Sequence, residues 1–179
     1  MRSVDTEVPV TLFVFNRSEQ LVQTLESLRN NKIPKLYVFS DGPRDKRDLE
    51  DIKKVRAMID AIDWVDVTKK YRDENKGLSK SIEDGLNEVF KKAEAVIVVE
   101  DDVCVAPGFY EFMKYSLYQY ADDSKVACVT GLRYPFDRSV FKNYEYDVFS
   151  LGGFHPGAGR HGSVSGSQLS LTVTIYRIC

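Results

Sequence analysis

The strongest chemical signal in the sequence is a run of three carboxylates, Glu100, Asp101 and Asp102. They directly follow residues 95–99 (AVIVV), an apolar run that is typical of a buried strand. Adjacent like charges repel one another, and a divalent cation would offset that repulsion. Because oxygen ligands suit Mg²⁺ or Mn²⁺, and such ions often bridge carboxylates to substrate phosphates, the triplet predicts a metal-dependent site. The alternative interpretation is a solvated loop or a helix-capping cluster.

Two other apolar runs also end in polar residues. Residues 8–15 (VPVTLFVF) lead into Asn16 and Arg17, and residues 35–40 (KLYVFS) lead into Asp41. In an open parallel sheet, ligands bind outside the carboxyl ends of the strands. We therefore expect these polar residues to lie along one edge with the acidic triplet.

The elements that must position these residues alternate along the chain. Leu21, Leu25 and Leu28 have helical spacing, which predicts a helix after the first strand. Further helices are predicted at 49–62, 78–90 and 108–120, the last opened by Pro107, and further strands at 64–68 and 126–131. This order predicts an α/β fold with a mostly parallel sheet and helices on both faces. No GxGxxG or GxxxxGK[ST] motif follows a strand, so the dinucleotide and P-loop fingerprints are absent.

The composition narrows the class of protein. The 179 residues are enough for one domain, and the formal net charge of −2 argues against a nucleic-acid partner. No run of 18 apolar residues or signal-peptide core occurs, so no integral membrane segment is expected. The three cysteines are widely spaced, which favours reduced thiols. We expect a cytoplasmic protein, either free or at the inner face of the membrane.

Residues 98–113 (VVEDDVCVAPGFYEFM) resemble the metal-binding segment of GT-A-fold glycosyltransferases. The resemblance is to the family 2 type and to enzymes like N-acetylglucosaminyltransferase I, which carry an Asp-x-Asp-type motif in the form Glu-Asp-Asp. Residues 8–17, 35–42 (KLYVFSDG) and 75–86 (NKGLSKSIEDGL) are similar in order and spacing. The resemblance covers about residues 8 to 135. It implies a Rossmann-like GT-A fold, incomplete at its C-terminus, and transfer of a sugar from a nucleotide diphosphate sugar to a hydroxyl acceptor such as a glycan, with inversion.

The resemblance also implies roles for the strand-end residues. Asp102 would bind Mn²⁺ or Mg²⁺ directly, and Asp101 and Glu100 would contact ribose or sugar hydroxyls. Arg17, beside Asn16, would lie near the diphosphate, where a guanidinium can pair with phosphate oxygens. Its alternative is a surface arginine at a helix start.

The same resemblance implies a nucleotide pocket farther along the chain. Asp41 would accept hydrogen bonds from the base; its alternative is a turn residue before Gly42-Pro43. Asn75, Gly77 and Lys80 would adjoin the pocket, although Asn75 could simply cap a helix and Lys80 could be solvated. The catalytic base belongs to the acceptor-binding half and is not assigned.

Two other functions stay open. A nucleotidyltransferase shares a Rossmann-like sheet and a carboxylate-bound Mg²⁺, but it normally has a glycine-rich, basic loop after the first strand, which FNRSEQ does not provide. A non-catalytic nucleotide-sugar-binding module is the second alternative.

The last part of the chain differs from the rest in composition. All 27 acidic residues lie at or before Asp147, and residues 149–179 contain none. The resembling enzymes have a Trp-rich segment such as SSWGWATW at this distance, and one permitted coding of residues 155–162 (HPGAGRHG) reads SWGWATW in another frame. We therefore predict two parts: 1–148, the nucleotide-sugar-binding half, and 149–179, a frameshifted tail without stable native structure that leaves the enzyme truncated and impaired. The alternative is a genuine Gly/Ser-rich tail.

Overall fold

A computed structural model of the chain describes residues 7–122, 129, 131 and 174–177. These residues all belong to one compact unit formed by 1–132 and 171–179, whereas the second unit, 133–170, lies outside them. The elements in chain order are β1 (Val10–Val14), α1 (Ser18–Asn30), β2 (Lys35–Ser40), α2 (Leu49–Asp60), β3 (Asp66–Tyr71), α3 (Leu78–Val89), β4 (Ala95–Glu100), α4 (Phe109–Gln119) and β5 (Thr174–Arg177).

The predicted parallel sheet is confirmed. The strand order is β3-β2-β1-β4-β5, and the first four strands run parallel to one another. Val14 pairs with Ser40, which in turn pairs with Tyr71, and Phe13 pairs with Glu100. Because these residues share one register, the four parallel strands end at the same edge. The segments that directly follow these four strands in the sequence therefore begin at that edge.

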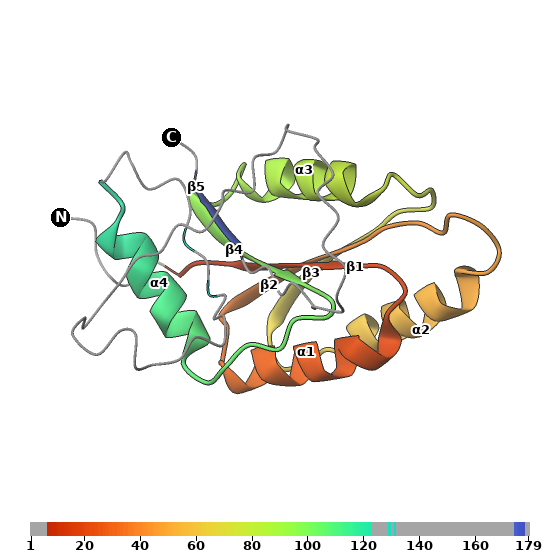
Figure 1. The fold of residues 1–179 in the computed structure, drawn as a ribbon, viewed down its shortest axis with the longest axis horizontal. Helices are drawn as coiled ribbons and strands as arrows, with labels where there is room; N and C mark the ends of the chain where they lie inside the picture. Colours follow the sequence, from red (N-terminus) through yellow and green to blue (C-terminus); the bar gives the residue numbers. More distant parts are fainter. Residues whose placement is uncertain (1–6, 123–128, 130, 132–173, 178–179) are drawn as a thin grey trace, which may run out of the picture. The chain divides into compact units, whose positions relative to one another are not determined.

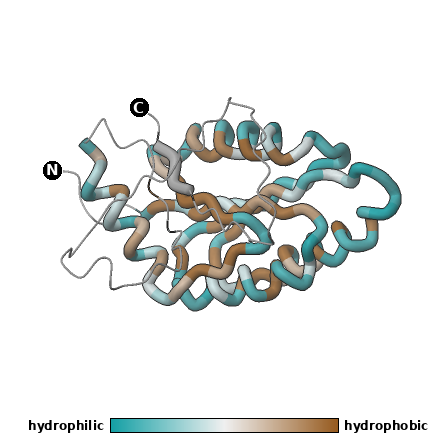
Figure 2. The backbone as a smooth tube through the Cα atoms, in the orientation of Figure 1, coloured by the Kyte–Doolittle hydropathy of each residue, from teal (hydrophilic) through white to brown (hydrophobic). Residues whose placement is uncertain are grey.

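Helices cover both faces of the sheet, with α3 on one face and α1 and α2 on the other (Figure 1). Alternate residues of β1 serve the two faces: Val10, Leu12 and Val14 join the apolar cluster of α1, α2 and α4, while Phe13 joins that of α3. The inner strands β1, β2 and β4 are mostly hydrophobic, and many polar residues lie on the outer sides of the helices (Figure 2). This is the pattern expected of a parallel sheet that is buried on both faces.

Some predicted boundaries differ from the structure. The third strand was predicted at 64–68 but runs from Asp66 to Tyr71, three residues farther. The lysines of its DVTKKY sequence hide the strand pattern because β3 is only half-buried at the edge of the sheet. Helix α4 follows an N-cap at Gly108, with a φ of 80°, so Pro107 precedes the cap. The predicted strand 126–131 lies outside the described residues except for 129 and 131.

The strand β5 lies within the predicted frameshifted segment, where we expected no stable structure. It pairs antiparallel with β4, with Ile97 opposite Ile175. Without β5, the edge of β4 that faces away from β1 would present unpaired backbone groups, and such an edge accepts any segment that can become extended. The remaining residues of the segment lie outside those described. None of the helices in the described ranges has the length and hydropathy required to span a membrane.

Candidate functional site

The acidic triplet and Arg17 meet where the strand order reverses. The chain proceeds from β1 to β2 and β3 on one side and then returns to β4 on the other. Open α/β sheets bind their ligands at this kind of switch point. Arg17, which precedes α1, forms an ion pair with Asp102, and its Nη1 lies 3.6 Å from Asp101 Oδ1. Two strand ends thus contribute opposite charges to one location.

Hydrogen bonds from β1 and α1 hold the acidic segment in place. The backbone N–H of Phe15 donates to Asp101 Oδ2 at 3.0 Å, and the Thr24 hydroxyl donates to the Asp101 carbonyl at 3.0 Å. Farther along, the N–H of Val105 donates to the Ser27 hydroxyl at 3.1 Å. Asp101 is therefore buried with a structural role, whereas the Asp102 carboxylate is partly exposed.

Burial and mutual repulsion shift the titration of the triplet. Desolvation is the largest cause of the raised pKa of Glu100, and the charges of Asp102 and Asp101 raise it further. The pKa of Asp101 is also raised, chiefly by burial, although the hydrogen bond from Phe15 opposes this. The single cation of Arg17 offsets only part of the three negative charges. An additional cation would therefore be stabilised at this site.

The carboxylates of the triplet fit a hard divalent cation that takes most of its ligands from water and substrate. Within the described residues, no group of three or more His, Cys, Asp or Glu side chains is arranged to enclose a metal ion. Asp102 can supply one direct carboxylate oxygen, since its side chain is partly exposed and, among the described residues, is bonded only to Arg17. Mg²⁺ in particular is commonly held by one or two carboxylates together with waters and substrate phosphates. The arrangement thus fits such an ion only if the substrate completes its coordination.

Asn16 lies at the same edge, and its side chain bonds to another residue of the chain. Its Nδ2 donates to Asp48 Oδ1 at 2.9 Å, and Asp48 also accepts from Arg44 Nε and Nη2 at 2.9 and 2.8 Å. The hydrogen bond from Arg44 is the main reason that the pKa of Asp48 is far below its usual value. The Arg44 guanidinium also stacks over the Phe15 ring, 4.8 Å from its centroid. Asn16 therefore ties the end of β1 to the start of α2, and its contact with a nucleotide stays a prediction.

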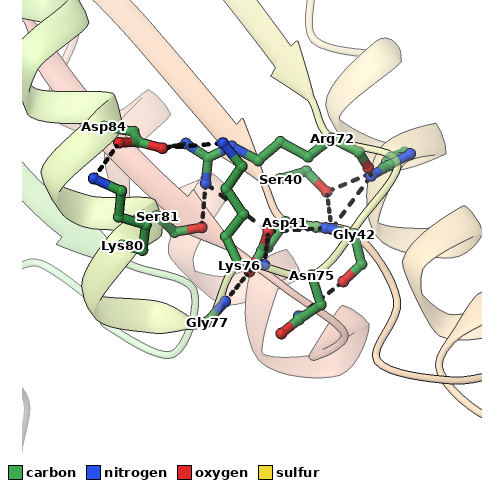
Figure 3. A network of polar contacts seen from close by, with 11 residues as sticks. Ser40, Asp41, Gly42, Arg72, Asn75, Lys76, Gly77, Lys80, Ser81 and Asp84 are labelled. Carbon is green, nitrogen blue, oxygen red and sulfur yellow. Dashed lines mark hydrogen bonds and ion pairs between the residues drawn. The ribbon is translucent and has the colours of Figure 1, made fainter.

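Asp41 lies in a second cluster, at the ends of β2 and β3 (Figure 3). Its carboxylate accepts from the backbone N–H of Gly42 at 3.1 Å, from that of Lys76 at 3.1 Å to each oxygen, and from that of Gly77 at 3.0 Å. Asn75 Nδ2 donates to the Gly42 carbonyl at 2.9 Å. Asn75 therefore does not act as the cap of α3, whose N-cap Gly77 has no side-chain cap hydrogen bond.

Two glycines permit this close approach. A Cβ on Gly42 would lie 2.4 Å from the backbone carbon of Glu74 and 2.6 Å from its nitrogen, closer than real Cβ contacts. Gly77 has a φ of 79°, a left-handed conformation that disfavours other residues. The segment 73–77 can therefore pack against the end of β2 only with glycine at both positions.

Lys80 lies at the periphery of this cluster. Its Nζ pairs with Asp84 at 3.1 Å and with Glu83 at 3.2 Å, and the hydrogen bond that it donates to Asp84 is the main cause of its raised pKa. Asp84 also pairs with Arg72 at 3.4 Å and with Lys76 at 3.3 Å (Figure 3). The charge of Lys80 is thus engaged on its own helix.

Two arginines of the cluster were not predicted from the sequence. Arg72 follows β3, with Nη1 3.9 Å from Asp41 Oδ1, and a longer predicted third strand would have placed it at the same edge. Arg56 of α2 donates through Nη2 to the carbonyls of Asp41 at 3.2 Å and of Arg72 at 2.6 Å, and through Nε to the Ser40 hydroxyl at 3.1 Å. The position of Arg56 on a helix did not indicate that it belongs to this cluster, because only the tertiary fold brings that helix to these strand ends.

Comparisons with known proteins agree with this architecture. The model of the family "Glycosyl transferase family 2" matches residues 10–166. No curated protein matches the chain. Among solved structures, the mannosyltransferase PcManGT from Pyrobaculum calidifontis, in complex with GDP-Man and Mn²⁺, is similar with a TM-score of 0.52 and 17% identity. The similarity covers 75% of this chain and 38% of that protein, so this chain spans well under half of its length.

Two further structures are similar at lower TM-scores. One is 4-diphosphocytidyl-2C-methyl-D-erythritol synthase from Anaerococcus prevotii, with a TM-score of 0.45, 13% identity and coverage of 71% of this chain and 55% of that one. The other is Rv0371C from Mycobacterium tuberculosis in complex with manganese, with a TM-score of 0.40, 21% identity and coverage of 76% and 74%.

The mannosyltransferase supports the fold: a mostly parallel sheet between helices, as in GT-A nucleotide-sugar transferases. The family match extends from the start of β1 past the end of α4, and so includes both clusters at the strand ends. The chain belongs to glycosyl transferase family 2.

Proposed function

We propose that this chain is the donor-binding part of a metal-dependent glycosyltransferase. The reaction would move a sugar from a nucleotide diphosphate sugar to a hydroxyl group of a glycan or other acceptor, with inversion at the sugar carbon. Family membership supports the class of reaction. The observation that carries the proposal is the ion pair between Arg17 and Asp102 at the switch point between β1 and β4. It joins a group suited to phosphate with a group suited to a metal ion.

The proposed roles follow from exposure and charge. Asp102 would bind Mn²⁺ or Mg²⁺, because its carboxylate is partly exposed and lies beside Arg17. Arg17 would move from Asp102 to the diphosphate once the metal is bound, since a guanidinium pairs well with phosphate oxygens. Asp101 and Glu100 would meet ribose or sugar hydroxyls. When bound, the metal ion stabilises the negative charge that develops on the departing diphosphate.

The acceptor side of the reaction requires more than the described residues. An inverting transfer needs a carboxylate base that takes the proton of the acceptor hydroxyl. We propose that this base belongs to an acceptor-binding half that a frameshift near Phe149 has removed. In this form the chain would bind a nucleotide sugar and transfer it poorly or not at all. We further propose a cytoplasmic site of action, free or at the inner face of the membrane, and no nucleic-acid partner.

Calorimetric titration with UDP and with GDP, with and without Mn²⁺, tests the proposal. We expect nucleotide binding that depends on Mn²⁺ and that is lost in Asp102→Ala. The matched control is Asp66→Ala, because Asp66 is exposed and pairs with Lys35 at the opposite edge of the sheet. Binding that does not depend on metal, or that survives Asp102→Ala, would favour a non-catalytic module. Binding of nucleoside triphosphates in preference to diphosphates would favour a nucleotidyltransferase.

A further inference from the structure

We infer that Asp48 is a positioning residue, which together with Arg44 holds the turn 15–17 so that the Arg17 guanidinium lies at the acidic triplet. This inference rests on the proposed function, because Arg17 is the group proposed to pair with the diphosphate. The turn has only three residues, between the end of β1 at Val14 and the start of α1 at Ser18. A shift of its backbone therefore moves Arg17 directly.

The position of Arg17 is not fixed by regular secondary structure. As the N-cap of α1 it has a φ of −99° and a ψ of 69°, which are neither helical nor strand values. Within the described residues its guanidinium pairs only with Asp101 and Asp102, and its side chain is half-exposed. A metal ion at Asp102 would take away the closer of these two partners. The direction of the guanidinium then depends on the backbone of the turn.

Two buried aspartates hold the turn on the two sides of β1. The backbone N–H of Phe15 donates to Asp101 Oδ2 at 3.0 Å, on the side of β4. Asn16 Nδ2 donates to Asp48 Oδ1 at 2.9 Å, on the side of β2 and α2. Because both acceptors are buried, neither contact is easily exchanged for one with water. The residues that precede Arg17 are therefore anchored from both directions.

Asp48 uses its carboxylate for this contact and not for its own helix. Aspartate is a favoured N-cap residue, and Asp48 is the N-cap of α2, yet it forms no side-chain cap hydrogen bond there. Its Oδ1 accepts from Asn16 and from Arg44 Nη2, and its Oδ2 accepts from the Arg44 backbone N–H at 3.1 Å and from Arg44 Nε at 2.9 Å. The carboxylate thus stabilises the turn after β1 and not the first turn of α2.

Arg44 connects Asp48 to a second residue of the turn. Its guanidinium forms two hydrogen bonds with the Asp48 carboxylate and lies over the Phe15 ring, 4.8 Å from the centroid. Asp48 therefore holds Asn16 directly and Phe15 through Arg44. Arg17 is the residue of the turn whose side chain pairs with the acidic triplet.

A double-mutant cycle between Asp48 and Arg17 tests the inference. UDP and GDP are titrated with Mn²⁺ into the wild type, Asp48→Asn, Arg17→Gln and the double variant. Asparagine is as good an N-cap as aspartate, but its single carbonyl oxygen cannot serve the four donors that the carboxylate serves. We expect Asp48→Asn to weaken nucleotide binding about three- to tenfold in the wild type, and by less than about twofold when Arg17 is already replaced.

The matched control is Asp51→Asn. Asp51 lies on the same helix, but its side chain is 47% exposed and pairs with Lys54. The same substitution there should leave the nucleotide affinity of the wild type unchanged. A loss in Asp51→Asn equal to that in Asp48→Asn would refute a specific role of Asp48.

Other roles of Asp48 predict different results. A residue that only supports the fold lowers the melting temperature and leaves the affinity of the folded protein unchanged. A residue that contacts the nucleotide itself causes the same loss with and without Arg17. Either result refutes the inference. If Asp48→Asn does not fold, Arg44→Gln decides, because the Arg44 side chain is 62% exposed: a loss that disappears in the Arg17→Gln background supports the inference, and an unchanged affinity or a persisting loss refutes it.

Amide hydrogen exchange separates a failure of this inference from a failure of the proposed function. Asp48→Asn should lower the protection of the Phe15 amide, which donates to Asp101, and Asp51→Asn should not. A wild type that binds neither UDP nor GDP with Mn²⁺ contradicts the proposed function. The exchange at Phe15 then still decides whether Asp48 holds the turn: lost protection supports this, and wild-type protection in the folded variant refutes it.

Discussion

Replacing Arg17 with glutamine should affect metal and nucleotide binding in opposite directions. Arg17 neutralises Asp102 when no metal is bound, so a metal ion has to displace it. The Arg17 side chain is 52% exposed and the Asp102 side chain 21% exposed, so solvent screens part of the attraction within the pair. A pair of this kind contributes about 0.3–1 kcal/mol. Arg17→Gln should therefore raise the affinity for Mn²⁺ alone by about two- to fivefold.

The effect on the nucleotide should be larger and of opposite sign. A hydrogen-bonded contact between a guanidinium and a phosphate group contributes about 1.5–3 kcal/mol, so the affinity for UDP or GDP with Mn²⁺ should fall by about 10- to 100-fold. Calorimetry gives both constants, and Arg29→Gln, at the far end of α1, is the matched control. An Mn²⁺ affinity that falls or does not change would refute the idea that Arg17 competes with the metal ion for Asp102. An unchanged nucleotide affinity would refute the role of Arg17 at the diphosphate.

Three further outcomes are expected. Gly42→Ala should lower the free energy of unfolding, measured in urea, by about 1–3 kcal/mol, because the added Cβ would meet the backbone of Glu74. A variant as stable as the wild type would contradict the close contact between Gly42 and Glu74. Glu100→Gln should raise the melting temperature of the metal-free protein at pH 7. The folded-state pKa of Glu100 is raised, so its ionisation opposes folding above that pKa, and the gain should vanish as the pH falls through it; a lower melting temperature at pH 7 would contradict this sign. The encoding DNA should contain a second frame that reads SWGWATW near residues 155–162 and continues beyond the present end; its absence would rule out the frameshift.

Most of the fold could be predicted because the core strands carry their own signal. Strands β1, β2 and β4 are buried on both faces, and their continuous apolar runs are visible without any structure. The edge strand β3 is half-buried and includes two lysines, so its start and end were misplaced. The error concealed Arg72, which belongs to the same edge as the predicted residues. The degree of burial therefore explains why the inner strands were predicted correctly and why the bounds of β3 were not.

The candidate site could be predicted only as a set of residue types. The acidic triplet, Arg17 and Asp41 were recognised because each follows a strand, and the parallel register brings those strand ends to one edge. The partners of each residue depend on side-chain and loop geometry that no local pattern encodes. Arg56 is the clearest case, since it reaches two strand ends from a helix whose periodicity indicates only packing.

The sequence by itself determined the class of fold, the edge of the sheet at which the candidate site lies, and the presence there of carboxylate oxygens of the kind that suit a hard divalent cation. These features follow from hydrophobic runs and from the polar residues that end them, and such patterns can be recognised within a few residues of sequence. Only the tertiary structure decided that Arg17 bonds Asp102 and that the Asp41 carboxylate is enclosed by backbone N–H groups of residues 42, 76 and 77. The contact of Arg17 with Asp102 spans 85 residues, and the contacts of Asp41 with residues 76 and 77 span 35 and 36, so they exist because packing brings these chain segments together.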